Sequence, residues 1–336
     1  MNGHQQLQNL LFSEDVNFST QARAVLMYQL EHNGIYRMFY ETLCNEAPDQ
    51  IDPDAIPMLP IRAFKEGKLY AAENDPELEF KSSGTGRHSR SRHLVSSADL
   101  YRQSIHAGIR RRFDLDAFTL LCYAPGYASN PHSSLLWMLN ELVASHSSSQ
   151  STFLPVGKQQ LLEARRIIQK QKNPVLIFGA AFGLLDLLEP GPLQLPEGSC
   201  IIETGGMKTY RREMSKQELR RQLSDGFSLP LHNLHSEYGM CELLSQCYAK
   251  GSEWFEAPPW MAVSVRNPDD PSEHCKPGEE GKLAIIDLAN IYSCPFLLTD
   301  DKGVMDEAGR FQVLGRWKGA ELRGCNFLID TEVDNG

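Results

Sequence analysis

The chain has 336 residues, of which 41% are hydrophobic and 23% are charged, so it can bury a sizeable core and is not a disordered chain. It carries 33 basic and 43 acidic residues, a formal net charge of −10. This balance argues against nucleic acid as the main partner, because a phosphate backbone requires a basic surface.

The N-terminal residues lack the basic and then apolar pattern of a secretory signal. The most apolar stretch, residues 174–190, is interrupted by Asp186 and Glu189 and is short for a membrane span. Eight cysteines occur without a CxxC pair. We therefore expect a cytoplasmic protein with reduced thiols and no membrane span.

The first third of the chain is expected to be helical, because apolar residues recur at helical spacing through residues 21–43. A proline-rich connector over residues 51–64 then favours extended chain. After a loop that contains "KSSGTG", Ser96 or Ser97 could cap a helix over residues 98–113.

From residue 117 onward, apolar runs alternate with helical patterns. Strands are expected at 117–125, 151–156, 173–180, 199–206 and 229–239. Helices are expected at 131–145 and 158–172, and after the capping box of Ser215 and Glu218. This alternation is typical of an α/β domain with a largely parallel sheet. Beyond residue 255, short strands separated by Pro, Gly and Asp turns indicate a β-rich subdomain.

Two stretches combine residue types that suit a nucleotide site. "KSSGTG" offers hydroxyl and backbone N–H groups to phosphate oxygens, with Arg87 next to it; a solvated basic linker is the alternative. "HSEYGMCE" ends a strand with an aromatic ring and a carboxylate, at the sheet edge where α/β proteins bind ligands. An ordinary strand-to-helix turn is the alternative there.

Taken in order, "KSSGTG", "EYGMCE", "GKLAIIDL", "TDD" and "LGRWKGAELRG" resemble the core motifs of the adenylate-forming superfamily. The chain most resembles its acyl-protein synthetase branch, the LuxE-type enzymes, in "IPMLPIRAFKEG", "ETGGMKTYRREMS" and "RGCNFLI". The resemblance implies the N-terminal lobe of an adenylate-forming enzyme, with mixed, largely parallel sheets and flanking helices. On this basis we expect an α/β adenylation core over 1–254, a β-rich subdomain over 255–314 and a tail after the hinge over 315–336.

The resemblance implies ATP and Mg²⁺ as cofactors and assigns roles to individual residues. Tyr238 matches the adenine-stacking residue, followed by Gly239 and Met240, and Glu242 matches the Mg²⁺-linked carboxylate. Asp300 matches the aspartate that binds the ribose hydroxyls, and Arg316 matches the arginine beyond it. The residues that match the loop over the β- and γ-phosphates are Ser82, Ser83, Gly84, Thr85 and Gly86, with Arg87 adding charge.

Two further residues are candidates for catalysis. Lys208 in "GGMK" could contact the substrate carboxylate or the α-phosphate, or could be a surface lysine near a turn. Superfamily members usually continue beyond the Gly-Arg hinge into a C-terminal lobe, which is not expected here. LuxE-type enzymes instead pass the acyl group to a cysteine near their own C-terminus. Cys325 fits that role, although a buried cysteine before an apolar strand is the alternative.

The expected function is therefore that of a ligase that activates a carboxylic acid, most simply a fatty acid, as an acyl-adenylate. The acyl group then passes to a protein thiol and onward to a partner reductase. Two alternatives remain open: an aryl-acid adenylating enzyme, and a non-catalytic nucleotide- or acyl-binding relative.

Overall fold

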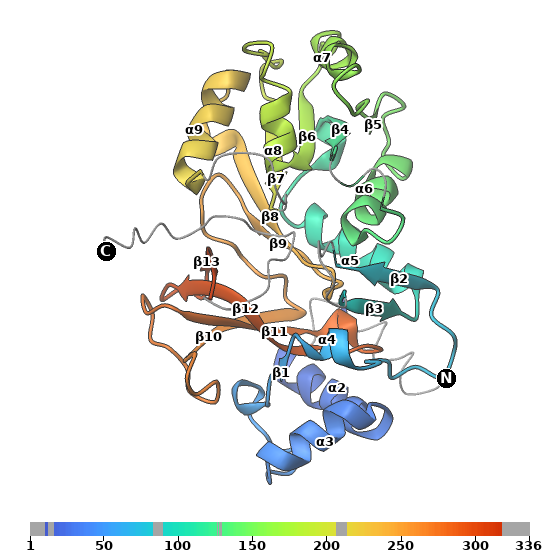
Figure 1. Cartoon of the computed structure of the whole chain (residues 1–336), viewed down its shortest axis with the longest axis vertical. Helices are drawn as coiled ribbons and strands as arrows, with labels where there is room; N and C mark the ends of the chain where they lie inside the picture. Colours follow the sequence, from blue (N-terminus) through green and yellow to red (C-terminus); the bar gives the residue numbers. More distant parts are fainter. Residues whose placement is uncertain are drawn as a thin grey trace.

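The computed structural model describes residues 11–12, 17–82, 90–125, 127, 130–205 and 214–317. Within these residues, none of the helices combines the length and apolar composition that a membrane crossing requires. Figure 1 shows two sheets, with helices on both sides of the upper sheet and below the lower one.

The larger sheet has six strands in the order β5-β4-β6-β7-β8-β9 (Figure 1). All neighbours pair in parallel except β9, which runs antiparallel to β8. The strands are β4 (Thr119–Tyr123), β5 (Thr152–Phe153), β6 (Val175–Ala180), β7 (Cys200–Thr204), β8 (Leu234–Tyr238) and β9 (Cys247–Ala249). Each parallel strand lies within a segment for which the sequence predicts a strand, so the predicted α/β fold with a largely parallel sheet is confirmed.

Helices cover both faces of this sheet. One face carries α5 (Ala98–Arg110) and α6 (Ser134–Ala144), and the other carries α7 (Leu161–Gln169), α8 (Ala181–Asp186) and α9 (Lys216–Phe227). Leu120 and Leu121 are neighbours on β4, yet they pack in the two different cores that these helix groups form. Successive residues of a strand point to opposite faces, so the strand is buried on both sides.

The smaller sheet has the order β1-β12-β11-β10, with β13 paired to β12. Its strands are β1 (Leu59–Pro60), β10 (Met261–Arg266), β11 (Gly281–Asp287), β12 (Phe296–Met305) and β13 (Phe311–Arg316). Only β1, which comes from the proline-rich connector, pairs in parallel. The β-rich segment thus supplies the antiparallel strands, and the N-terminal region completes the sheet.

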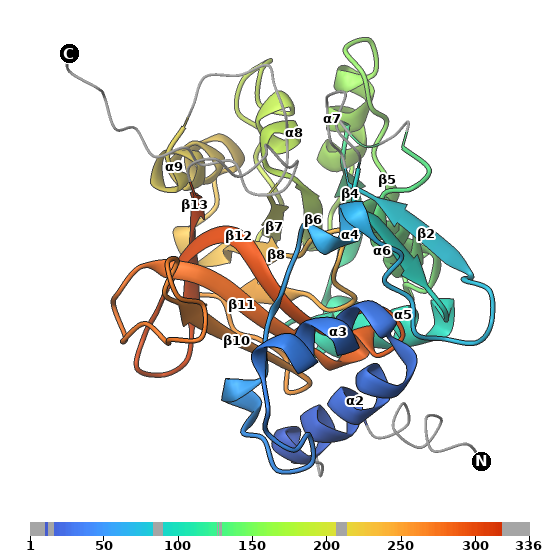
Figure 2. The same cartoon turned by 60° about the horizontal axis from the view of Figure 1, so that its bottom comes forward.

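The N-terminal helices α2 (Phe18–His32) and α3 (Gly34–Leu43) pack against the smaller sheet, as Figure 2 shows. They are separate because the Asn33 side chain begins α3 by accepting a hydrogen bond from Tyr36 N at 3.2 Å. Gln29 Nε2 donates to Ile291 O at 2.6 Å, and Tyr36 stacks on Phe296 with ring centroids 5.3 Å apart. These contacts join the N-terminal helices to residues that lie far along the chain.

A two-stranded hairpin, β2 (Leu78–Lys81) and β3 (Arg92–Val95), flanks the hydroxyl-rich loop. Ser91 N donates to Ser82 Oγ at 3.0 Å, and Ser82 N donates to Ser91 O at 3.1 Å, so the hairpin is closed at the base of the loop. The sequence analysis did not predict these strands. It did predict the cap of α5, which is Ser97: its Oγ accepts from Leu100 N at 3.1 Å.

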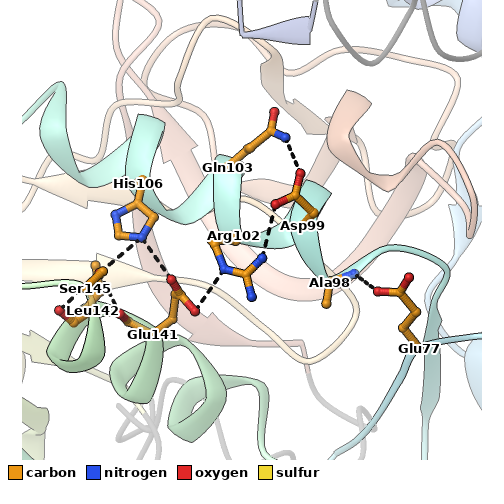
Figure 3. A network of polar contacts seen from close by, with 9 residues as sticks. All are labelled: Glu77, Ala98, Asp99, Arg102, Gln103, His106, Glu141, Leu142 and Ser145. Carbon is orange, nitrogen blue, oxygen red and sulfur yellow. Dashed lines mark hydrogen bonds and ion pairs between the residues drawn. The ribbon is translucent and has the colours of Figure 1, made fainter.

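Helices α5 and α6 are joined at their outer surface by Glu141 (Figure 3). Arg102 Nε lies 3.1 Å from one Glu141 oxygen, and His106 Nε2 lies 3.3 Å from the other. The rings of Tyr101 and Trp137 also stack between the two helices, with centroids 4.9 Å apart. The helix pair is therefore held together by both polar and aromatic contacts. The shorter elements are α4 (Ala63–Glu66) and the 3-10 turns η1 (Pro53–Ala55), η2 (Leu115–Ala117), η3 (Leu231–Asn233) and η4 (Leu288–Asn290).

Candidate active site

One cavity lies where the carboxyl ends of β7 and β8 approach strands β12 and β13 of the smaller sheet. Its wall is completed by the end of β2, by side chains of α5 and α6, and by the loop between β8 and β9. Open α/β sheets bind ligands at the carboxyl ends of their strands. The cavity has an internal volume of about 60 Å³ and opens to solvent.

Most of the predicted site residues that the structure describes line this cavity: Ser82, Gly239, Met240, Glu242, Asp300 and Arg316. They come from segments that are far apart in the sequence, so their meeting is a property of the fold. The remaining predicted residues, except Tyr238, lie outside the described residues: Ser83, Gly84, Thr85, Gly86, Arg87, Lys208 and Cys325.

Tyr238 lies behind the cavity wall. Its ring is buried against Phe255 and Phe311, with centroids 5.9 and 5.6 Å away. Its hydroxyl donates to Asp301 Oδ2 at 2.9 Å, and the other Asp301 oxygen lies 3.3 Å from Arg316 Nε. Burial, followed by the nearby Asp301 carboxylate, raises the pKa of Tyr238 well above its usual value, so the hydroxyl keeps its proton and remains a donor.

Two adjacent carboxylates therefore lie at the cavity edge. Asp300 has a side chain that is 14% exposed, and Arg62 Nε lies 3.8 Å from it. The Asp301 side chain is more buried, with 5% of its surface exposed, and it connects Tyr238 to Arg316. The sequence analysis named Asp300 and missed Asp301. The doubled aspartate in "TDD" was the available signal, but sequence alone could not show which carboxylate Tyr238 contacts.

The Glu242 segment is held in place through its backbone. His93 Nδ1 donates to Cys241 O at 2.7 Å, and Asn290 Nδ2 donates to Glu242 O at 2.6 Å. Burial lowers the pKa of His93, which is fully buried, so the ring is neutral with its proton on Nδ1. Both anchoring residues were missed by the sequence analysis because they lie on other elements, β3 and η4.

The same segment is fixed further along by Asp287, at the end of β11. Asp287 Oδ2 accepts hydrogen bonds from Leu244 N at 2.9 Å and Ser245 N at 3.0 Å, and Oδ1 accepts from Ser245 Oγ at 2.6 Å. The Asp287 side chain is fully buried. Glu242 is thus presented to the cavity by a loop whose backbone is fixed on both sides.

Lys81 adds a positive charge to the cavity wall at the base of the hydroxyl-rich loop. Its Nζ lies 3.0 Å from Glu79 Oε2 and 3.5 Å from His132 Nε2. The backbone there is fixed as well, because Lys81 N donates to His132 O at 3.0 Å. The sequence analysis quoted this lysine within "KSSGTG" without giving it a role.

Glu237 also lines the cavity and was not predicted as a site residue. It is 4% exposed, and Thr204 Oγ1 donates a hydrogen bond to its Oε2. Burial is the largest cause that raises its pKa to about 7, and the Glu203 charge raises it further, while Thr204 opposes the shift. A charged residue inside the predicted strand that contains "LHSEY" was the signal that could have identified it.

Comparisons with known proteins identify the family and the fold. A family model described as "Acyl-protein synthetase, LuxE" matches residues 138–333, which is more than half of the chain. A search of curated protein sequences gave no match. The solved structures that share the fold are enzymes of the adenylate-forming type, so the predicted fold is confirmed.

Three of these solved structures illustrate the likeness. An open 2-hydroxyisobutyryl-CoA ligase with bound 2-HIB-AMP and CoA has a TM-score of 0.62 and 14% identity over 88% of this chain and 73% of its own. ATP-bound MatB from Rhodopseudomonas palustris has a TM-score of 0.52 and 16% identity over 74% of this chain and 50% of its own. The luciferase-like enzyme of Zophobas morio has a TM-score of 0.51 and 18% identity over 83% and 63%. This chain thus spans about half the length of MatB.

Proposed function

The chain belongs to the LuxE acyl-protein synthetase family, and we propose that it uses ATP to convert a carboxylic acid into an acyl-adenylate. A carboxylate oxygen attacks the α-phosphorus, the bond to the β-phosphate oxygen breaks, and pyrophosphate leaves. The observation that carries this proposal is the convergence of Ser82, Glu242, Asp300 and Arg316 on one cavity. Both reactants are anions, so the site must chiefly position them and offset their charge.

In this proposal the nucleotide lies between the smaller sheet and the hydroxyl-rich loop. Asp301 accepts the ribose hydroxyls, because its oxygens are oriented by Tyr238 and Arg316 and a carboxylate can accept about four hydrogen bonds. Asp300, to which the sequence resemblance gives this role, lies beside it. Lys81 and the loop from Ser82 to Gly86 face the phosphates, and Lys208 contacts the reacting carboxylate or α-phosphate. Stacking of Tyr238 on adenine, as the resemblance implies, would need the ring to face the cavity.

The carboxylate of Glu242 fits a Mg²⁺ ion. It is a hard oxygen donor on a cavity wall, and Mg²⁺ usually keeps several waters and binds through one or two carboxylates together with substrate phosphates. When bound there, Mg²⁺ would neutralise charge on the phosphate oxygens. What the chain itself supplies is the position of that carboxylate, through the bonds from His93 and Asn290 to the backbone.

For the second step we propose that the thiolate of Cys325 attacks the acyl carbonyl and AMP leaves, which gives a thioester on the enzyme. A fatty acid as the substrate, a reductase as the next acceptor and a cytoplasmic location complete the proposal. Mass spectrometry after incubation with ATP and acid is expected to show one acyl adduct that is lost in Cys325→Ser. An adduct that persists in that variant would place the acceptor at another residue.

The first step is tested by ATP–pyrophosphate exchange with a panel of fatty and aryl acids, because exchange reports adenylation without an acyl acceptor. We expect exchange with fatty acids and a loss of about a hundredfold or more in Glu242→Gln. The exposed Glu307→Gln serves as the matched control. Exchange with aryl acids alone would overturn the fatty-acid assignment, and full exchange in Glu242→Gln would overturn the metal assignment.

A further inference from the structure

The wall of the cavity contains a polar group that the adenylation step does not use. Glu237 ends β8 just before Tyr238, and its Oε2 is occupied by the Thr204 hydroxyl. Its Oε1 is directed toward Gly239, where an added Cβ would lie 2.4 Å from it. Among the described residues, no donor forms a hydrogen bond with Oε1. Glycine at position 239 thus leaves this carboxylate oxygen uncovered.

A second acceptor lies close to the first. Gln246 lines the same cavity, is 6% exposed, and has its Oε1 buried without a hydrogen-bond partner in the described part of the chain. Its Cγ is 3.5 Å from the position that a Cβ on Gly239 would take. Glu237, on β8, and Gln246, just before β9, therefore approach the same glycine. A buried polar atom without a partner, such as Gln246 Oε1, is rare in folded proteins. Its position on the cavity wall, close to the Glu237 oxygen, indicates a ligand that donates a hydrogen bond there.

Part of the cavity wall is apolar or aromatic, although Thr204, Ser133 and Ser134 also line it. Tyr101, Leu135 and Met138 from α5 and α6 line the cavity as well. Glu203, the charged group identified as acting on Glu237, has the same sign. An acyl chain can therefore pack along α5 and α6, while Glu237 and Gln246 can accept hydrogen bonds from a polar substituent at the other end of the cavity.

We propose that Glu237 and Gln246 recognise a hydroxyl or amino group on the acyl part of the acid, so that the substrate class is a substituted acid and not a plain alkanoic acid. This inference rests on the proposed adenylation. A plain alkyl chain would bury both acceptors without a donor, and sites built to bind a polar substituent strongly reject the analogue that lacks it. Glu237 is a specificity-determining residue in this scheme and takes no part in the bond changes at the α-phosphorus.

The test compares acids of equal chain length in pyrophosphate exchange: the unsubstituted acid and its hydroxyl- and amino-substituted forms. We expect the wild-type kcat/KM to favour a substituted acid by at least about tenfold. In Glu237→Leu this preference falls by about tenfold, while exchange with the plain acid is retained or rises. Gln246→Leu is expected to reduce the preference in the same direction, and it provides the test if Glu237→Leu does not fold. Glu307→Gln should keep the wild-type preference.

The outcomes separate this inference from the proposed function. Exchange that occurs with equal kcat/KM for all acids overturns the specificity role and leaves adenylation intact. An unchanged preference in both variants, with a raised KM for ATP, assigns the acceptors to the nucleotide and also overturns the inference. If no acid supports exchange in the wild-type protein, adenylation itself fails, and the inference fails with it.

Discussion

The hydroxyl of Tyr238 donates to Asp301 at 2.9 Å, and this bond joins the larger sheet to the smaller one at the edge of the cavity. Asp301 also lies 3.3 Å from Arg316, so three residues from β8, β12 and β13 meet at one carboxylate. A carboxylate fixed from two sides loses little freedom when it binds a ligand. Its orientation is thus set before the nucleotide arrives.

Tyr238→Phe tests this positioning role directly, because it removes the hydroxyl and keeps the ring. A hydrogen bond to a charged group contributes about 1.5–3 kcal/mol, so we expect the KM for ATP in pyrophosphate exchange to rise about tenfold or more. The ring contacts with Phe255 and Phe311 should preserve the fold. If Tyr238→Phe is indistinguishable from wild type while Tyr238→Leu loses activity, the ring acts by stacking and the hydroxyl is not needed.

The adjacent carboxylates can be separated by a pair of substitutions. Asp301→Asn is expected to raise the KM for ATP more than Asp300→Asn does, because Asp301 is held by Tyr238 and Arg316 whereas Asp300 lies 3.8 Å from the exposed Arg62. The comparison should also be made with 2′-deoxy-ATP. If Asp301 binds the ribose, the increase in KM for 2′-deoxy-ATP over ATP should be smaller in Asp301→Asn than in the wild-type protein. If this increase is smaller only in Asp300→Asn, Asp300 is the residue that binds the ribose.

Much of the fold follows from patterns that the sequence displays openly. The apolar runs of β4 and β6 are nearly continuous because both faces of these strands are buried. The hairpin of β2 and β3 gave no such signal: each strand has four residues, and Glu79, Lys81 and Arg92 are polar. Short, polar strands lack the periodicity on which prediction depends.

The candidate site likewise contains some residues that sequence motifs identify and others that they do not. Residues that occur within recognisable motifs, such as Glu242 and Asp300, could be named from the sequence, and these two line one cavity. Residues that support a motif from another element could not be named, because their contacts are between distant parts of the chain. His93 reaches Cys241 across 148 positions in the sequence, and no local pattern encodes such a contact.

Asp287 is expected to be essential for stability, because it holds the Glu242 loop. Asp287→Ala leaves the N–H groups of Leu244 and Ser245 buried without an acceptor, which should lower the free energy of unfolding by about 3 kcal/mol or more. Urea denaturation measures this change. The exposed Asp269→Ala is the control and should lie within about 0.5 kcal/mol of wild type. A small loss for Asp287→Ala would mean that the loop is not anchored there.

The last prediction concerns pH and uses the raised pKa of Glu237, which is about 7 compared with a usual 4.5. The folded protein binds this proton more tightly than the unfolded chain does, so the carboxyl stabilises the fold below about pH 4.5. That contribution is lost as the pH rises through 7. The loss corresponds to roughly 3 kcal/mol for a shift of this size. Glu237→Gln stays neutral, so its stability relative to wild type should increase from pH 5 to about pH 7 and level off toward pH 8.

The comparison must be made between the two proteins at each pH, because His235 acts in the opposite direction. Burial, followed by the charges of Lys250 and Arg220, lowers its pKa to about 4, so its contribution to stability is lost as the pH falls below about 6.5. This contribution is present in both proteins and cancels in the difference between them. Urea unfolding at pH 5, 6, 7 and 8 gives that difference. A difference that stays constant over this range would show that Glu237 ionises normally and that its cavity is well solvated.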